Sequence, residues 1–231
     1  GESGSGKSTT ARRVLRLTDP SAGQVLLDGT DVTAATGRER LALWREVQLV
    51  HQNPDSSLDP RWSVERVIAE PLRAMGLGSA ADRRSRVAEL LDAVGLPQAV
   101  ATSRPTALSG GQRQRVAVAR ALAPRSSLVV LDEALSALDV VTQDRVLALL
   151  SRIQRETGVS YLFISHDLAT VRLFAQHVVV LRHGRVVEQG PAEQVFTDPR
   201  SPDVRELLAA VPGQRLLTGH HLEPQTAGAT P

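Results

Sequence analysis

The chain opens with Gly1-Glu2-Ser3-Gly4-Ser5-Gly6-Lys7-Ser8-Thr9, a stretch that fits the pattern G-x-x-x-x-G-K-[S/T] of a phosphate-binding loop. Glycines in such a loop let backbone N–H groups turn inward around phosphate oxygens, and the N-terminus of the following helix adds a favourable dipole. Lys7 is the only lysine of the sequence. Its compact ammonium suits the gap beside the β- and γ-phosphates better than a planar guanidinium does. The stretch therefore predicts a nucleotide site in which the Ser8 hydroxyl faces Mg²⁺.

The alternative reading of this stretch is a Gly/Ser linker, which Lys-Ser-Thr in register before an apolar helical run disfavours. A phosphate loop also needs a buried strand before it, and residue 1 already lies within the loop. We therefore expect the sequence to be an N-terminally truncated piece of a longer chain, with at least one core strand in the missing part.

The composition is that of a globular protein with one core. The 231 residues are 42% hydrophobic and 23% charged, which is ordinary for a soluble domain. The absence of cysteine excludes a disulfide framework, a Cys-ligated zinc site and an iron–sulfur cluster. No apolar run approaches the ~20 residues of a membrane span. A net charge of only +2 gives little support for nucleic-acid binding, and no nucleic-acid partner is expected.

Strands and helices alternate along most of the chain. Apolar spacing predicts helices over residues 8–17, 41–45, 64–75, 82–94, 109–123, 140–157, 168–174, 192–196 and 204–210. It predicts strands over residues 24–27, 47–50, 128–131, 161–164, 178–181 and 185–188, the last two joined as a hairpin by His183-Gly184. This order predicts an α/β fold with a mostly parallel sheet flanked by helices. Residues 53–108 break the alternation, as an inserted helical subdomain would.

Four further polar motifs follow predicted strands or open a predicted helix. Asp132 could hold Mg²⁺ through water, and the adjacent Glu133 could act as base toward an attacking water. The serine hydroxyl, glycine N–H groups and helix dipole of Ser109-Gly110-Gly111-Gln112 make a second anion site. Gln52 could contact Mg²⁺ or the attacking water, and His166 could hydrogen-bond a γ-phosphate.

Each of these motifs alone has an ordinary structural explanation, such as a turn, a helix N-terminus or a surface side chain. Two separate phosphate-binding devices in one chain are harder to explain, because they lie at opposite ends of the helical insert. A head-to-tail dimer accounts for both, since each ATP then lies between Lys7 of one chain and Ser109 of the other.

The motifs together resemble those of ATP-binding cassette (ABC) ATPases, in order and in spacing, over about residues 1–212. They are the Walker A phosphate loop (Gly1–Thr9), the Q-loop (Gln52), the signature (Leu108–Gln112), Walker B (Leu128–Asp132), the catalytic Glu133, the D-loop (Ser136–Asp139) and the switch His166. The resemblance implies a RecA-like P-loop core over 1–52 and 123–190 with N-terminal strands missing. It also implies a helical signature subdomain over 53–122, a C-terminal helical extension over 191–212 and a disordered tail over 213–231.

The resemblance also implies roles for individual residues. ATP binding falls to Gly1, Glu2, Ser3, Gly4, Ser5, Gly6, Lys7, Ser8 and Thr9. Catalysis falls to Glu133, His166 and Gln52, and Mg²⁺ binding to Ser8, Gln52 and Asp132. Ser109, Gly110, Gly111, Gln112 and Asp139 are expected to act on the ATP of the partner chain.

Finer features are similar to the peptide/nickel importer branch, particularly its second ATPase subunit. These are residues 52–61, residues 161–167 and the ending Val195-Phe196-Thr197-Asp198-Pro199-Arg200-Ser201-Pro202. Three positions depart from that branch without removing a catalytic group: His51 stands where Phe is usual, Ala134-Leu135 stand where Pro-Thr is usual, and the ending lacks a His and a Tyr.

This similarity implies an ATPase that drives import of peptides or similar small solutes from the cytoplasmic face of the membrane. Its partners would be transmembrane permease subunits, a second ABC ATPase subunit (heterodimer favoured) and, indirectly, an extracytoplasmic solute-binding protein. The alternative function is a soluble ABC ATPase in translation or DNA repair. A generic P-loop kinase does not explain the signature.

Overall fold

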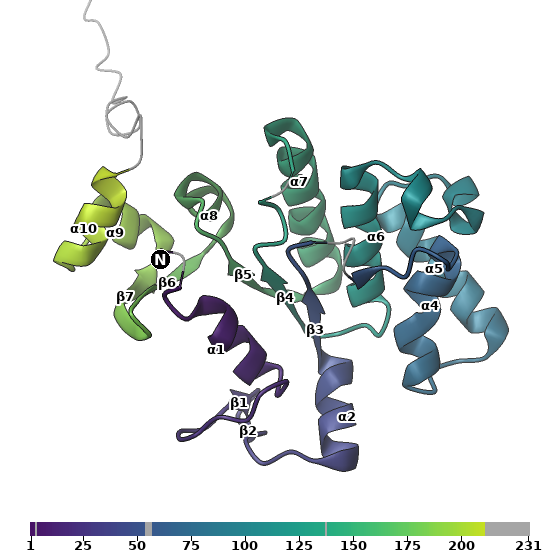
Figure 1. The fold of residues 1–231 in the computed structure, drawn as a ribbon, viewed down its shortest axis with the longest axis horizontal. Coiled ribbons are helices and arrows are strands. Elements are labelled where there is room, and N and C mark those ends of the chain that lie inside the picture. Colours follow the sequence, from purple (N-terminus) through teal and green to yellow (C-terminus); the bar gives the residue numbers. More distant parts are fainter. Residues whose placement is uncertain (3, 54–56, 137, 211–231) are drawn as a thin grey trace, which may run out of the picture.

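The computed structural model describes residues 1–2, 4–53, 57–136 and 138–210 (Figure 1). Its helices are α1 (Lys7–Val14), α2 (Gly37–Glu46), α4 (Val64–Ala74), α5 (Ala80–Ala93), α6 (Gly110–Leu122), α7 (Val140–Thr157), α8 (Leu168–Phe174), α9 (Ala192–Thr197) and α10 (Pro202–Ala209), with 3₁₀ turns η1 (Gln98–Thr102) and η2 (Pro105–Ala107). Its strands are β1 (Leu26–Leu27), β2 (Thr30–Asp31), β3 (Val47–Val50), β4 (Leu128–Asp132), β5 (Ser160–Ile164), β6 (His177–Arg182) and β7 (Arg185–Pro191).

The central sheet is parallel, as predicted. β4 lies in the middle and pairs with β3 on one side and β5 on the other. Two antiparallel hairpins, β1–β2 and β6–β7, accompany it. Because parallel strands end at the same edge, the residues that follow β3, β4 and β5 gather at one side of the sheet.

The central sheet is covered on both faces, because side chains alternate along each strand. Val129 and Leu131 of β4 pack into a large cluster with α6 and α7. Val130, between them, packs into a smaller cluster with α1 and α2. Figure 1 accordingly shows α1 and α6 well apart, with the strands between them.

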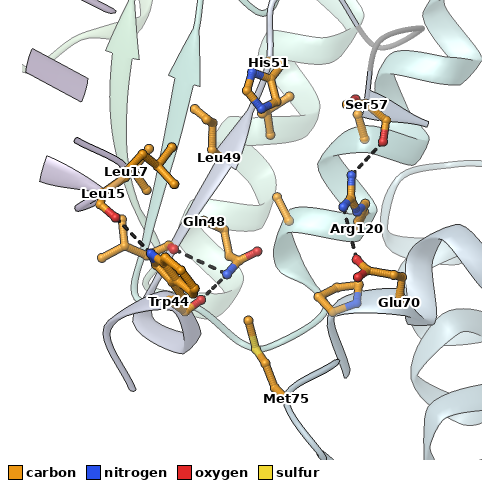
Figure 2. A pocket seen from close by; sticks show the side chains of 15 residues that line it. Leu15, Leu17, Trp44, Gln48, Leu49, His51, Ser57, Glu70, Met75 and Arg120 are labelled. Atoms are coloured by element: carbon orange, nitrogen blue, oxygen red, sulfur yellow. Dashed lines mark hydrogen bonds and ion pairs between the residues drawn. The ribbon is translucent and has the colours of Figure 1, made fainter. Parts of the chain in front are cut away.

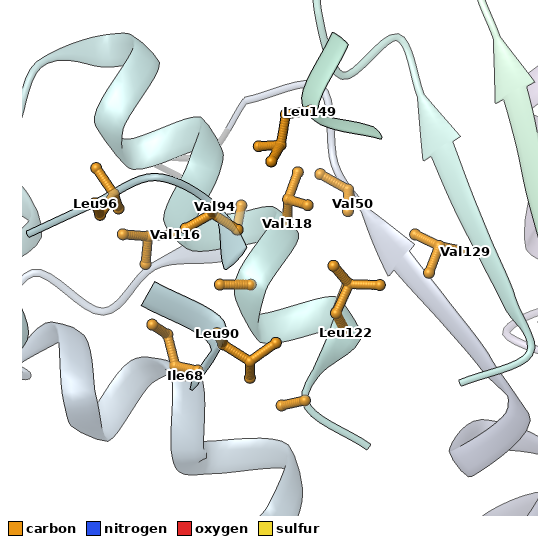
Figure 3. Packing of buried hydrophobic residues seen from close by; sticks show 14 of the residues in the cluster. Val50, Ile68, Leu90, Val94, Leu96, Val116, Val118, Leu122, Val129 and Leu149 are labelled. Atoms are coloured by element: carbon orange, nitrogen blue, oxygen red, sulfur yellow. The ribbon is translucent and has the colours of Figure 1, made fainter. Parts of the chain in front are cut away.

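The helices α4, α5 and α6 pack together and share their core with the sheet. Ile68 of α4 and Leu90 of α5 are almost fully buried in the same cluster as Val129. Figure 3 shows Val118 and Leu122 of α6 between the helical residues and the strands. The insert is therefore tied to the sheet through α6. The predicted limits of the subdomains remain predictions.

Truncation of the Ile68 side chain tests this shared core. Ile68 is 0% exposed. We expect Ile68→Ala in the full-length protein to lower the free energy of unfolding by about 2–5 kcal/mol and Ile68→Val by about 0.5–1.5 kcal/mol, because each deletion leaves a cavity that the surroundings fill only in part. Leu173→Ala is the control: that side chain is 80% exposed, and its loss should change stability by less than about 0.5 kcal/mol. Urea unfolding that ranks the three variants otherwise would contradict the packing.

The predicted hairpin at His183-Gly184 is confirmed as β6–β7, and it carries the C-terminal helices. Val178 and Val180 of β6 pack on α9 and α10. Arg182 pairs with Asp203 at 2.5 Å and with Glu206 at 3.0 Å. These contacts fix residues 191–210 on the hairpin. The tail predicted over 213–231 lies outside the described residues.

Helix boundaries differ from the prediction most at α2, which begins at Gly37 rather than near residue 41. Thr36 and Glu39 form a reciprocal capping box that starts the helix one turn earlier than the apolar spacing indicates. α1 ends at Val14, short of the predicted residue 17. The turns η1 and η2 had no counterpart in the prediction. Within the described ranges, no helix combines the length and apolarity that a membrane span requires.

Candidate active site

The phosphate loop turns sharply at two glycines. Gly4 and Gly6 have φ values of +78° and +100°, which glycine adopts without the strain of a side chain. The β6–β7 turn supports the loop, because the Gly184 N–H donates to the Ser5 carbonyl at 3.0 Å. A side chain at Gly6 would lie 3.5 Å from Gly184 Cα, so the turn packs directly against the loop. Ser3 lies outside the described residues.

Lys7 reaches back into the loop. Its Nζ donates to the carbonyls of Gly1 at 2.8 Å and Glu2 at 2.7 Å and lies 3.3 Å from Ser5 Oγ. The ammonium is therefore held where the loop converges, with oxygen partners that phosphate oxygens can replace. Thr9 is exposed in the first turn of α1.

The sheet edge brings Ser8 and Asp132 together from positions 124 residues apart. Ser8 Oγ, in the first turn of α1, donates to Asp132 Oδ1 at 2.8 Å, and Asp132 ends β4. A hydroxyl and a carboxylate at this spacing are hard oxygen donors, which fit the few protein ligands that Mg²⁺ takes at a nucleotide site.

Glu133 and His166 face one another at the same edge. Glu133 Oε2 lies 3.4 Å from His166 Nδ1, an ion pair only when the imidazole is protonated. The Glu133 backbone is in the left-handed region, with φ +49°, and its N–H donates to the Ile164 carbonyl at 2.9 Å. These residues line a cleft of about 170 Å³ together with Ser136, Gln143 and Asp167. A carboxylate and an imidazole on one cleft can bind a water and a phosphate oxygen.

Gln52 reaches the same edge through Ser136. Gln52 Nε2 lies 3.4 Å from Ser136 Oγ, and that hydroxyl donates to the Glu133 carbonyl at 2.9 Å. In the described part of the chain Gln52 makes no hydrogen bond to Asp132, so its role toward Mg²⁺ stays a prediction. The sequence predicts Ser136 only as the start of the D-loop, and its position three residues after Glu133 accounts for its contact with the Glu133 carbonyl.

The signature opens α6 with a reciprocal cap. Ser109 Oγ accepts from the Gln112 N–H at 3.3 Å, and Gln112 Oε1 accepts from the Ser109 N–H at 2.9 Å. Gly110 and Gly111 occupy the first two helical positions, whose N–H groups have no intrahelical acceptor. Among the described residues, no hydrogen bond links residues 109–112 to the phosphate loop. The signature is thus a capped helix start with no hydrogen bond to the phosphate loop among the described residues, and its role toward an anion stays a prediction.

Asp139 of the D-loop is exposed and caps α7. Its carboxylate accepts from the Thr142 N–H at 3.0 Å and from Thr142 Oγ1 at 2.7 Å. Hydrogen bonds from the Thr142 backbone and then its side chain lower the pKa of Asp139 below its usual range. Because the pKa of Asp139 is lower in the folded state, the contribution of this cap to stability is fully present above the unfolded-state pKa. It is lost as the pH falls through the folded-state pKa. Asp139 is therefore an ionised cap at neutral pH.

Comparison with known sequences agrees with this geometry. The sequence profile described as ABC transporter matches residues 1–136. The chain is 49% identical over 212 residues to the oligopeptide transport ATP-binding protein OppD of Mycobacterium tuberculosis, covering 92% of this chain and 34% of that protein. It is 46% identical to the glutathione import ATP-binding protein GsiA of Escherichia coli K12, with the same coverage. The chain thus spans about a third of the length of these relatives.

Solved structures of ABC proteins superpose on the chain. The cbiO1 protein of Clostridium perfringens, described as part of the ABC transporter complex cbiONQ, has a TM-score of 0.78 at 28% identity, covering 94% of this chain and 84% of that one. The ATP-binding cassette MJ0796, solved as a dimer bound to ADP and Pi, has a TM-score of 0.73 at 31% identity, covering 83% of each chain. The motifs, the sheet edge on which they meet and these similarities agree, and the chain belongs to the ABC transporter ATP-binding family.

Proposed function

We propose that the protein hydrolyses ATP as the motor subunit of an importer for peptides or similar small solutes. One observation carries the ATPase assignment: the pairs Ser8–Asp132 and Glu133–His166 meet at one sheet edge beside the phosphate loop. The import assignment is supported by the relatives named for oligopeptide transport and glutathione import.

The chain's own residues divide the reaction between them. Lys7 and the loop amides bind the β- and γ-phosphates, which positions the γ-phosphate for in-line attack. Ser8, Gln52 and Asp132 would hold Mg²⁺, which when bound neutralises charge on the phosphates. Glu133 orients a water and accepts its proton as the water oxygen bonds to the γ-phosphorus and the bond to the β,γ-bridging oxygen breaks. His166 donates a hydrogen bond to a γ-phosphate oxygen.

The site is completed by a second cassette in a head-to-tail dimer. The exposed helix end of the signature offers Ser109 Oγ and the N–H groups of Gly110 and Gly111 to the γ-phosphate bound by the partner. Asp139 lies at the start of α7, between the two sites. The partner is a sister ATPase or a second copy of this chain, and the assembly lies at the cytoplasmic face of the membrane.

A pocket beside β3 is the proposed docking site for the permease. It has a volume of about 310 Å³ and lies between α2, β3, α4 and α6, with Trp44, Leu49 and Met75 among its lining residues (Figure 2). Partial desolvation lowers the pKa of His51, which also lines the pocket.

This pocket is linked to the nucleotide site through β3 and α6. β3 runs along it and leads directly to Gln52. Arg120 of α6 donates to the Ser57 carbonyl at 2.8 Å and to Glu70 Oε2 at 3.1 Å, which ties α6 to α4 and to the segment after Gln52. Movement of the helices α4, α5 and α6 on ATP binding would therefore change the shape of the pocket. An extracytoplasmic solute-binding protein would act on the permease from the other side.

The test uses the full-length protein reconstituted with its permease in lipid vesicles. We expect the permease to raise ATP turnover, and we expect Met75→Asp to abolish most of that rise while leaving basal turnover unchanged, since a charge in the apolar pocket blocks docking. Leu173→Asp, on an exposed position outside the pocket, is the control. The transport assignment would be overturned if ATP turnover were the same with and without the permease and the protein copurified with ribosomes or DNA. That result would favour a soluble ABC ATPase.

A further inference from the structure

The first turn of α7 touches three motifs that act at different places. Thr142 holds Asp139 of the D-loop with both its backbone N–H and its hydroxyl, at 3.0 and 2.7 Å. Gln143 Nε2 donates to Thr170 Oγ1 at 2.6 Å and lies 3.4 Å from Asp167 Oδ2, directly after the switch His166. One helical turn thus joins the D-loop to the switch segment.

The other side of Thr142 faces the signature. An added side-chain carbon at Gly111 would lie only 2.5 Å from Thr142 Cγ2, whereas Thr142 Cβ and Oγ1 would each lie 3.8 Å away. The methyl group alone therefore fills the space next to Gly111. Because a side-chain carbon at Gly111 would overlap this methyl group, the starts of α6 and α7 lie too close together here for any residue larger than glycine.

The two halves of the threonine side chain have separate partners. Its hydroxyl holds Asp139, and its methyl group touches Gly111. Valine would keep the methyl group and lose the hydroxyl, while serine would do the reverse. Of these three side chains, only threonine makes both contacts.

We propose that Thr142 is a positioning residue for closure on ATP, which sets the Asp139 carboxylate and the signature glycines at a fixed separation so that both meet the partner cassette in register. This inference rests on the proposed function, because it requires closure of two cassettes around ATP. Thr142 does not touch the reacting atoms. It acts through Asp139 and Gly111.

The hydroxyl is tested by release of trapped ATP. The full-length protein, with its partner cassette, carries Glu133→Gln, is loaded with labelled ATP and is then chased with unlabelled ATP. We expect Thr142→Val to speed release about three- to tenfold, the effect of one lost hydrogen bond. The thermal midpoint should move little, because the Asp139 carboxylate still caps the backbone N–H and the methyl group still packs on Gly111.

The methyl group is tested by a double-mutant cycle. Gly111→Ala alone should speed release strongly, because the new carbon overlaps Thr142 Cγ2. In the Thr142→Ser background, Gly111→Ala should speed release by a smaller factor, because serine lacks the methyl group that the new carbon would overlap. The effects of the two changes on the release rate should therefore be non-additive. Additive effects in the cycle would overturn the steric half of the inference.

The outcomes separate this inference from the function on which it rests. Thr142→Val that releases ATP at the parent rate would overturn the proposal. Faster release accompanied by a clear drop in the thermal midpoint would also overturn it, because Thr142 would then have a structural role only. A Glu133→Gln parent that does not retain ATP would overturn the proposed function, and the inference with it.

Discussion

We expect Glu133→Gln to lower the rate of ATP hydrolysis by the full-length protein by a factor on the order of 10² to 10⁴, the contribution of a general base. Glutamine has the shape of glutamate and keeps one hydrogen-bonding oxygen, but it cannot accept the proton of the attacking water. The Ser8–Asp132 pair and Lys7 do not depend on Glu133, so ATP binding should persist. The measurement is phosphate release at saturating ATP, beside equilibrium binding of a fluorescent ATP analogue.

The variant should also collect as a closed dimer with ATP bound, because the step that opens the dimer follows hydrolysis. A matched control is Glu89→Gln, an exposed glutamate of α5 outside the cleft, whose turnover should equal that of the wild type. Normal turnover by Glu133→Gln would mean that another group activates the water, and the assignment of the Glu133–His166 cleft would fail.

Lys7→Ala is expected to reduce both binding and turnover. The ammonium makes three contacts within the loop, and each can pass to a phosphate oxygen. Because a hydrogen bond to a charged group contributes about 1.5–3 kcal/mol, loss of one such contact weakens ATP binding roughly ten- to a hundredfold. Hydrolysis should fall further, by a factor on the order of 10² to 10³, because Lys7 also stabilises charge that develops in the transition state.

Lys7→Arg separates charge from shape. It keeps the positive charge, but a planar guanidinium does not match the narrow space between the loop carbonyls, so we expect little recovery. Arg13→Ala, an exposed cation in the last turn of α1, is the control for a general loss of charge and should bind ATP normally. Full activity of Lys7→Arg would show that the loop needs only a positive charge near its centre.

Much of this architecture could be predicted from the sequence because the chemistry is local. The phosphate loop, the signature and Asp132-Glu133 are short patterns of residues that lie close together in the sequence. The apolar run of β4 and the long amphipathic spacing of α7 also match the structure closely. The prediction is wrong at the start of α2, where the apolar spacing begins near residue 41 but the capping pair Thr36 and Glu39 starts the helix at Gly37.

What the sequence could not supply is contact between distant residues. No pattern in either helix predicts that Thr142 touches Gly111, or that Gln52 reaches Ser136, because both contacts depend on how α6 and β3 lie against β4. The order of the strands, with β4 between β3 and β5, is likewise a property of the packed sheet. The turns η1 and η2 contain too few residues to show a period.

The β6–β7 hairpin contacts two other parts of the chain, the phosphate loop at its turn and the helices α9 and α10 along its strands. Its turn supports the phosphate loop through the Gly184 N–H, and Arg182 secures α10 only two residues earlier. A shift of the hairpin would therefore move the phosphate loop and α10 together. The hairpin is thus a shared support for the phosphate loop and for the helices α9 and α10.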